Sequence, residues 1–596
     1  MSLTLKQLNH LPDADFITAL DGIYERSSWI VERTLAGRPF PTLAALKFAL
    51  QQTVRSASAE EKLALIRAHP QLASKAAIGT LTRESAGEQT LAGLQNCSVE
   101  EFTILQKLNL EYETRFGFPF ILAVRGPDGK GLSREAIIGT FSRRLRNPRD
   151  DEIAECLRQI GRIAEIRLND LFDHRCISGM RILEQADRLA AWSDEETGLT
   201  CTYMTDAHQK VAAQLAEWMR ETGMQVHIDA VGNVVGRYLS DRPDAKTLMT
   251  GSHYDTVRNG GKYDGRAGIL IPIAVVRHLH DHGEKLPFHL EVIGFSEEEG
   301  VRFKSPFLGS RAMTGKFDPA LLQTTDSNGV SLREALHGAR HDPSRIIAIA
   351  RDPAGLSGFV EIHIEQGPVL LEQDIPVGIV SSINGSIRYL ITLKGIASHA
   401  GTTPMTMRRD AAAAAAEIVL LVERRCGLVP SVVGTVGQLQ VPGGSVNVIP
   451  GTCVFSLDIR APEDALRDAA VNDIVAGIDA ICARRGIEAI VERTMNAAAT
   501  PCASALKSQL VAAVERTGLP TVELPSGAGH DAMILAEMTG IAMLFIRCGN
   551  GGISHNPLET MTADDAELGA GIFLDFLRNF KESDATRTCT WKADQS

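Results

Sequence analysis

The chain has 596 residues, of which 44% are hydrophobic and 22% are charged, a composition typical of a soluble globular protein with more than one domain. Its net charge of −12 argues against a nucleic-acid partner. Ten scattered cysteines without CxxC pairs, the lack of a signal peptide and the lack of an apolar run of bilayer length predict a cytoplasmic protein with no membrane partner.

Residues 1–172 are predicted to form an all-α domain. Apolar residues recur at helical spacing, as in Leu43 and Leu46, and residues 153–171 form one long amphipathic helix. No series of strands is visible in this part of the sequence. Residues 173–187 are expected to form a linker that is partly helical and therefore stiff.

After residue 187 strands and helices alternate, which predicts an α/β domain made of residues 188–384 and 499–582. Its strands are expected at residues 225–229, 233–238, 247–250, 288–295, 359–362 and 541–546. Residues 385–498 interrupt this domain as an inserted α+β domain. The insert is expected to hold strands 387–393, 432–439, 445–449 and 453–460 and helices 409–425 and 462–485.

The stretch GSHYDTVRNGGKYDGRAG, residues 251–268, follows a buried strand and precedes an apolar helix. It places His253, Asp255 and Asp264 on a loop at the C-terminal edge of a parallel sheet, which is a usual location for an α/β active site.

Further carboxylates and histidines follow other strands. Glu297, Glu298 and Glu299 follow strand 288–295 after one serine, and like charges so close together favour a bound cation. A single histidine on a loop is more often a surface or capping residue, but an ordered set at strand ends favours a metal centre. The set suits two divalent ions, Zn²⁺ or Mn²⁺, with the predicted ligands His253, Asp264, Glu299, His363 and His555.

Glu298 lies next to a predicted ligand and is expected to remain uncoordinated, as the general base that acts on water. The ions would lower the pKa of that water and polarise the scissile carbonyl. Asp264 is expected to bridge the two ions, and Asp255 to hold the tautomer of His253.

Nine ordered motifs carry a resemblance to a known family: GSHYDTV, GGKYDG, FSEEEGVRF, EIHIEQGP, GIASHAGTTPM, SVNVIPG, LDIRAP, SGAGHDA and GISHNP. Over about residues 180–580 the chain resembles the dinuclear-metal amidohydrolases of the aminoacylase and carboxypeptidase type. Within these it is similar to the branch that cleaves N-carbamoyl groups, which comprises N-carbamoyl-amino-acid hydrolase, β-ureidopropionase and allantoate amidohydrolase.

The resemblance implies the same metal ligands and the same base. It further implies that His399 stabilises the oxyanion from the partner subunit, and that the insert is a lid that forms a homodimer. Substrate contacts are implied for Gln366, Asn447, Arg460 and His530, with Arg460 on the substrate carboxylate.

The helical domain carries a second candidate site. His69 precedes Pro70, Glu88 lies on a polar stretch, and Arg162 lies on a late helix. A His/Glu pair with an arginine suffices for proton transfer on an anionic substrate, and no metal set is visible. A histidine before proline is nonetheless more often a helix end, and an arginine on a helix face is usually a solvated charge.

The ordered motifs HPQLASK, SAGEQ, FGFPFI and QIGRIAEIRL, across about residues 8–172, resemble 2-oxo-4-hydroxy-4-carboxy-5-ureidoimidazoline (OHCU) decarboxylase. The resemblance implies His69 and Glu88 as the catalytic pair and the loss of CO₂ without a cofactor, followed by protonation to S-allantoin. It implies substrate binding by Pro70, Ser85, Gln89, Ile121 and Arg162.

Together the two resemblances predict a bifunctional enzyme of ureide catabolism. The N-terminal domain would make S-allantoin, and the C-terminal domain would hydrolyse allantoate to ureidoglycine, ammonia and CO₂. An N-carbamoyl-L-amino-acid hydrolase or a β-ureidopropionase, fused to a decarboxylase or to a non-catalytic helical domain, is the alternative.

Overall fold

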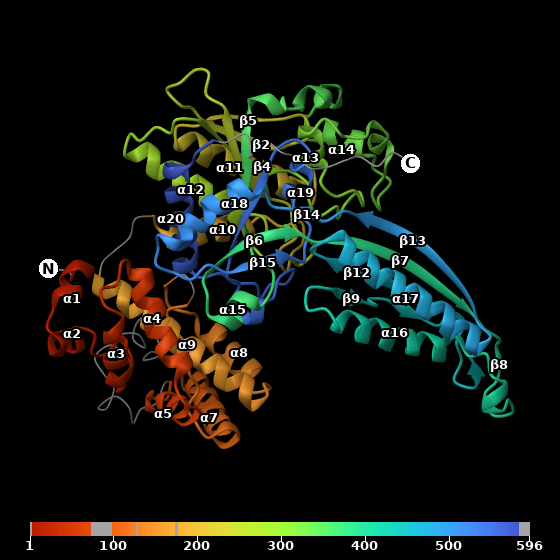
Figure 1. Cartoon of the computed structure of the whole chain (residues 1–596), viewed down its shortest axis with the longest axis horizontal. Coiled ribbons are helices and arrows are strands. Elements are labelled where there is room, and N and C mark those ends of the chain that lie inside the picture. The colour runs from red at the N-terminus through yellow and green to blue at the C-terminus, as the bar shows by residue number, and fades with distance from the viewer. Residues whose placement is uncertain (1–2, 73–97, 127–128, 173–176, 583–596) are drawn as a thin grey trace.

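The computed structural model describes residues 3–72, 98–126, 129–172 and 177–582. Figure 1 shows three bodies: a helical N-terminal region, a larger body around a mixed sheet, and an elongated insert that projects from that body.

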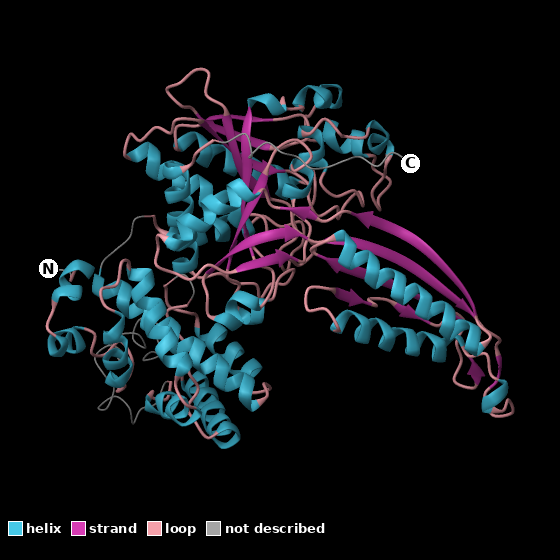
Figure 2. Ribbon diagram, viewed as in Figure 1, coloured by secondary structure: helices cyan, strands magenta, loops and turns pink. Residues whose placement is uncertain are grey.

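The N-terminal region is built from helices, and its described part contains no strand (Figure 2). The helices are α1 (Leu5–His10), α2 (Asp13–Ala19), α3 (Ser28–Thr34), α4 (Leu43–Ser56), α5 (Ala59–Ala68), α7 (Val99–Phe116), α8 (Arg134–Arg144) and α9 (Arg149–Phe172). Inside this region the fully buried Arg144 pairs with Glu152 at 2.5 Å and donates to the carbonyl of Ile121 at 2.7 Å. Over the residues that the structure describes, the predicted helical fold is confirmed, and this buried ion pair joins α8, α9 and residues 118–123.

The linker predicted at residues 173–187 extends too far toward the C-terminus. Residues 179–190 form helix α10 (Gly179–Ala190), and its Ile182, Leu183 and Ala186 are fully buried in the core of the larger body. Because this helix packs against α20 (Ala563–Asn579), it belongs to the α/β domain and does not connect two independent bodies. The amphipathic pattern of a core helix and that of a stiff linker are the same at the level of sequence.

The larger body is organised around a nine-stranded sheet of order β1-β2-β4-β3-β5-β16-β6-β14, with β15 beside β6. The strands are β1 (Gln225–Ile228), β2 (Val234–Tyr238), β3 (Thr247–His253), β4 (His289–Phe295), β5 (Leu356–Ile364), β6 (Val377–Ile383), β14 (Thr500–Pro501), β15 (Glu523–Ser526) and β16 (Ile541–Ile546). The central strands β4, β3, β5 and β16 are parallel, whereas β1, β2, β6 and β14 pair antiparallel with their neighbours on the path. The sheet is therefore mixed, and only its centre is parallel as expected.

Helices cover both faces of this sheet, and alternating side chains of each strand enter different cores. One core contains α10 with α11 (Asp206–Glu221), α12 (Ala267–Asp281), α18 (Ser504–Glu515) and α20. The opposite face is covered by α13 (Leu308–Met313), α15 (Val369–Gln373) and α19 (Asp531–Leu535), and α14 (Leu332–Gly338) packs farther out. Val234 and Val235 show the alternation, since they pack into different cores.

The insert has its own sheet of order β10-β12-β7-β13, with β9 beside β12, covered by two helices. Its elements are β7 (Gly385–Lys394), α16 (Ala411–Gly427), β9 (Val433–Thr435), β10 (Leu439–Gln440), β12 (Thr452–Ala461), α17 (Asp464–Arg485) and β13 (Glu488–Ala497). The predicted strand 432–439 is two short strands, and β13 was not predicted. Because β13 is a largely exposed edge strand with a bulge at Arg493/Met495, its sequence lacks a clear apolar alternation.

A two-stranded ribbon, β8 (Ser398–His399) with β11 (Val448–Ile449), lies at the far end of the insert (Figure 1).

Candidate functional site

The parallel centre of the sheet brings three histidine- and carboxylate-bearing segments to one edge. His253 is the last residue of β3 and pairs in register with Phe295, the last residue of β4, after which Glu298 and Glu299 follow. His363 lies near the end of β5. Because parallel strands end at the same edge, these side chains converge although the sequence separates them widely.

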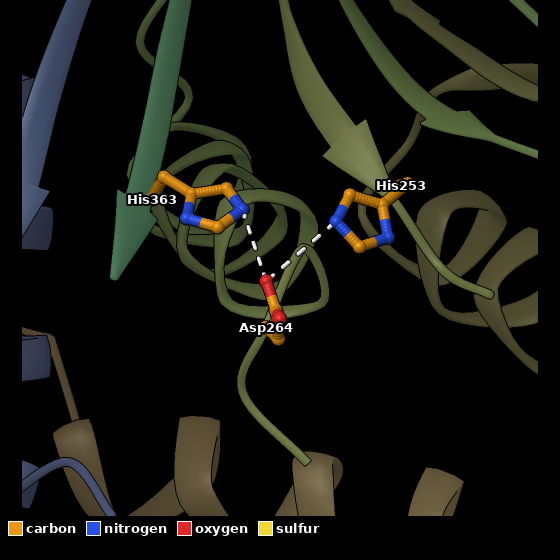
Figure 3. Close-up of side chains that lie close together, drawn as sticks. All are labelled: His253, Asp264 and His363. Carbon is orange, nitrogen blue, oxygen red and sulfur yellow. Dashed lines mark ion pairs between the residues drawn. The ribbon is translucent and has the colours of Figure 1, made fainter. Parts of the chain in front are cut away.

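Asp264, on the loop before α12, is the centre of this cluster (Figure 3). Its Oδ1 lies 3.7 Å from Nε2 of His253 and 3.3 Å from Nε2 of His363. This buried oxygen accepts no hydrogen bond from the residues that the structure describes.

The hydrogen bonds of the two imidazole rings indicate which kind of partner Oδ1 of Asp264 requires. Nδ1 of His253 faces the carbonyl of Asp255 at 3.2 Å, and Nδ1 of His363 faces the carbonyl of Ile364 at 2.8 Å. In a neutral ring Nδ1 is then the donor, so Nε2 presents a lone pair. Two nitrogen lone pairs that face one carboxylate oxygen repel it unless a cation lies between them, so the donor set fits a metal ion.

A second group shares the same carboxylate. The other oxygen of Asp264, Oδ2, lies 3.1 Å from Nε2 of His555, which is 3.5 Å from Oε1 of Glu299. Within the described residues, His253, Asp264 and His363 form one possible metal-binding group, and Asp264, Glu299 and His555 form another. Asp264 therefore belongs to both groups, which is the position expected of a residue that bridges two metal ions.

The carboxylates beside these groups are held close together by Asp255. Its two carboxylate oxygens accept the backbone N–H groups of Glu298 and Glu299, each at 3.1 Å. Burial raises the pKa of Glu298 well above its usual range and that of Glu299 to about 7. Bound divalent ions would favour the ionised forms of both carboxyl groups.

Glycine is required beside the first group. Gly265 has φ +62°, and a Cβ atom there would lie 2.5 Å from the ring of His253.

The predicted substrate residues of the main body lie near this centre. Gln366 donates to Oδ2 of Asp264 at 2.9 Å and lies 3.4 Å from His555. His530 is buried, stacks edge-on against His363 with ring centroids 4.5 Å apart, and shares a hydrogen bond with Ser526 at 2.7 Å.

The predicted site residues of the insert lie in two separate places. Arg460, on β12, donates to the carbonyl of Gly527 at 2.6 Å, and this contact places it beside the loop that leads to His530. His399 and Asn447 lie together on the distal ribbon, where Ala400 N–H donates to the carbonyl of Asn447 at 2.9 Å. No contact among the described residues joins either one to the metal-binding groups of the same chain.

In the helical domain, His69 is buried at the end of α5, and its Nε2 has no hydrogen-bond partner among the described residues. Burial, together with the charge of Arg167, lowers the pKa of His69 to about 3, so the ring is neutral. Arg167 is itself buried and donates to the carbonyl of Gly22 at 2.7 Å. Sequence reasoning missed Arg167, although it lies within the quoted motif QIGRIAEIRL.

Arg162 faces a different direction. It pairs with Glu165 at 2.7 Å and with Asp564 of the α/β domain, and it lines a cavity of about 770 Å³ between the two domains. Five residues along α9 separate Arg162 and Arg167 by about 140° around the helix. No contact among the described residues joins Arg162 to His69.

The remaining predicted residues of this domain are distributed as follows. Pro70 directly follows His69 and is half-buried, and Ile121 is buried with its carbonyl bound by Arg144. The residues Ser85, Glu88 and Gln89 lie outside the described residues.

Sequence reasoning also missed Glu559. It is buried on the loop that carries His555, and it accepts hydrogen bonds from Tyr263 N–H, Asp264 N–H and the Ser554 hydroxyl. Burial, reinforced by the charge of Asp264, raises its pKa to about 7. The only available signal was a carboxylate four residues after a predicted ligand.

In the part of the chain that the structure describes, no helix combines the length and the apolar character needed to cross a membrane.

Comparison with known proteins gives two family matches. The OHCU decarboxylase family matches residues 9–169, and the peptidase family M20/M25/M40 matches residues 249–579. An N-carbamoyl-L-amino acid amidohydrolase from Geobacillus stearothermophilus is 39% identical over 397 residues, which cover 66% of this chain and 97% of the relative. An allantoate deiminase from Arabidopsis thaliana is 37% identical over 437 residues, which cover 68% of this chain and 83% of the relative.

Among solved structures, an amidase of the hydantoinase/carbamoylase family from Burkholderia multivorans matches with a TM-score of 0.62 and 34% identity. The match covers 67% of this chain and 97% of that one. Both resemblances inferred from the sequence are therefore confirmed.

Proposed function

The chain belongs to the peptidase family M20/M25/M40, with an OHCU decarboxylase domain in front, and from this we propose that it is a bifunctional enzyme of ureide catabolism. The N-terminal domain decarboxylates OHCU to S-allantoin. The C-terminal domain hydrolyses allantoate to ureidoglycine, ammonia and CO₂. The observation that carries the second activity is the position of Asp264, which is shared by two groups of metal-binding side chains.

One divalent ion would be held by His253 and His363. The other would be held by Glu299 and His555, and Asp264 would bind both ions. The donor set of imidazoles and carboxylates suits Zn²⁺ or Mn²⁺. When bound, these ions polarise the scissile carbonyl and make an attacking water more acidic.

Glu298 would act as general base and then as general acid. Its backbone is fixed by Asp255, and its side chain lies in the cluster of His253 and Glu299. It takes the proton from the attacking water and passes it to the leaving nitrogen. Arg460 would bind the substrate carboxylate, for which a planar guanidinium provides two parallel donors.

In the helical domain His69 and Glu88 would move the proton. We assign the substrate-carboxylate contact to Arg167 in place of Arg162, because Arg162 is paired with Asp564 of the other domain, whereas Arg167 is buried and its charge lowers the pKa of His69. The bond between the carboxylate carbon and the ring breaks, CO₂ leaves, and the ring carbon takes up a proton. No cofactor is needed for this step.

We also propose a homodimer that forms through the insert. The insert exposes several large apolar side chains, among them Met405, Met407, Leu428 and Val446. Burial of such side chains against a second copy is favourable. The position of His399 on the distal ribbon supports a role at the partner's metal centre. A cytoplasmic location remains an expectation from the sequence.

A second candidate activity is hydrolysis of N-carbamoyl-L-amino acids, because the Geobacillus relative bears that name and is 39% identical. The fused decarboxylase domain favours allantoate, since its product S-allantoin is itself a ureide.

One set of assays tests both halves. Purified protein with Mn²⁺ is expected to release ammonia from allantoate much faster than from N-carbamoyl-L-amino acids, and to speed the loss of OHCU as followed by circular dichroism. Turnover of carbamoyl amino acids alone would replace the main proposal by the second candidate. If His69→Ala decarboxylates OHCU as well as the wild type does, the helical domain is a scaffold.

A further inference from the structure

We infer that Glu559 is a positioning residue that clamps together the two loops carrying the shared carboxylate and His555. The inference rests on the proposed metal centre.

The clamp consists of three hydrogen bonds to one buried carboxylate. Oε1 accepts the backbone N–H groups of Tyr263 at 2.8 Å and Asp264 at 3.1 Å. Oε2 accepts the hydroxyl of Ser554 at 2.7 Å, and that hydroxyl also lies 3.4 Å from Oδ2 of Asp264. One side chain therefore joins the 259–265 turn to the 547–562 loop, which are about 290 residues apart in sequence.

Close packing leaves Glu559 little freedom. Its side chain is 4% exposed, and a Cβ atom at Gly261 would lie 2.1 Å from its carboxylate carbon. Glu559 belongs to none of the possible metal-binding groups among the described residues, so it acts through Asp264 and Ser554 and not on the ions themselves.

The 547–562 loop needs such an anchor because it has little regular structure. Asn550, Gly551, Gly552 and His555 all have positive φ values. The side chain of His555 is 51% exposed, whereas that of His253 is 3% exposed. A ligand on an exposed, irregular loop is positioned by the contacts of its neighbours, and loss of such contacts typically weakens metal binding about 10–100-fold.

Calorimetric titration of metal-free full-length protein with Mn²⁺ tests the clamp. The variant Glu559→Ala is expected to bind one of two Mn²⁺ ions at least about 10-fold more weakly, and at saturating Mn²⁺ to lower kcat for allantoate more than it changes KM. Glu559→Gln keeps one carbonyl oxygen for the two backbone N–H groups and should restore most of the affinity. Ser554→Ala should produce a smaller loss in the same direction.

Asp326→Asn is the matched control, because this carboxylate also accepts two backbone N–H groups, at 2.9 and 3.0 Å, but lies outside the metal-binding groups. If both Glu559→Ala and Ser554→Ala bind two Mn²⁺ ions as tightly as the control does, the clamp is refuted while the metal centre stands. If the wild type binds no Mn²⁺, the metal centre is refuted and the clamp with it. Should Glu559→Ala not fold, Ser554→Ala decides.

A different observation carries a second inference: we propose that Asp564 of α20 anchors the decarboxylase domain to the hydrolase domain. Its carboxylate pairs with Lys47 of α4 at 3.3 Å and with Arg162 of α9, and it accepts a hydrogen bond from Asn169 of α9. One partly buried anion thus receives three donors from the other domain.

The anchor acts on the helix that supports the proposed decarboxylase site, since α9 also carries Arg167. Removing the carboxylate would take away the anion that Lys47 and Arg162 share, and both cations lie largely buried at the interface.

Thermal unfolding of the full chain, followed through residual decarboxylase activity, tests this anchor. Asp564→Ala is expected to lower the midpoint of decarboxylase inactivation by about 5 °C or more. Asp575→Ala is the control on the same helix, because Asp575 pairs with Arg516 inside the hydrolase domain. Equal midpoints for the two variants would overturn the anchor.

Discussion

The two candidate sites of this molecule are assembled in different ways. The hydrolase site lies at the end of the parallel centre of a mixed sheet, where register brings His253, Glu299 and His363 together. The helical site depends on loops and helix ends, and only His69 of its predicted catalytic pair lies in the described part. A motif at the end of a strand therefore predicts where its side chains lie in the fold better than a motif at the end of a helix does.

Arg162 and Arg167 make the difference concrete. Both are arginines of α9 within one motif, yet Arg162 pairs with Asp564 of the neighbouring domain, whereas Arg167 is bound by Gly22 and Glu25 inside the helical domain. On a strand, side chains two residues apart point to the same face of the sheet. On a helix, a shift of five residues turns the side chain by about 140°, away from the site.

The largest expected effect concerns the sheet-edge site. Glu298→Gln should lower kcat for allantoate by about 10²–10⁴-fold and leave bound metal unchanged, because Glu298 is assigned proton transfer and no ion. The neighbouring Glu299→Gln is the matched variant and should lose metal. Metal analysis beside steady-state kinetics checks both, and loss of metal from the Glu298 variant would mean that the two roles are exchanged.

Variants of the insert and of the metal centre test whether the partner subunit supplies a residue to this site. His399→Ala and Glu298→Gln should each be almost inactive alone. If His399 acts on the partner's centre, subunit exchange between the two variants should restore about a quarter of wild-type activity, because half of the dimers are mixed and each has one intact site. No recovery after verified exchange would show that His399 serves its own chain or no site.

The smallest expected effect concerns the pH dependence of stability of the helical domain. The pKa of His69 is lowered to about 3 in the folded state, against about 6.5 in an unfolded chain. Between these values the unfolded state binds more protons, so this contribution to stability is present above about pH 6.5 and is lost as the pH falls toward 3.

His69→Gln removes that proton linkage. The midpoint of decarboxylase-domain unfolding should therefore fall less between about pH 7 and about pH 4.5 in this variant than in the wild type. Scanning calorimetry at the two pH values measures the difference. An equal fall in both proteins would contradict a buried neutral His69.

The sequence by itself determined the helical and α/β parts, the two families and the five predicted metal ligands, whose side chains converge in the fold. It could do so because apolar periodicity and strand-end motifs are local, and because parallel register makes separate strand ends meet.

Only the tertiary structure decided the remaining features. It assigned α10 to the hydrolase core, added the edge strand β13, directed Arg162 to Asp564, and placed Glu559 against Asp264. Each of these depends on what a side chain or strand meets across the fold, and such contacts between residues far apart in sequence leave no local pattern.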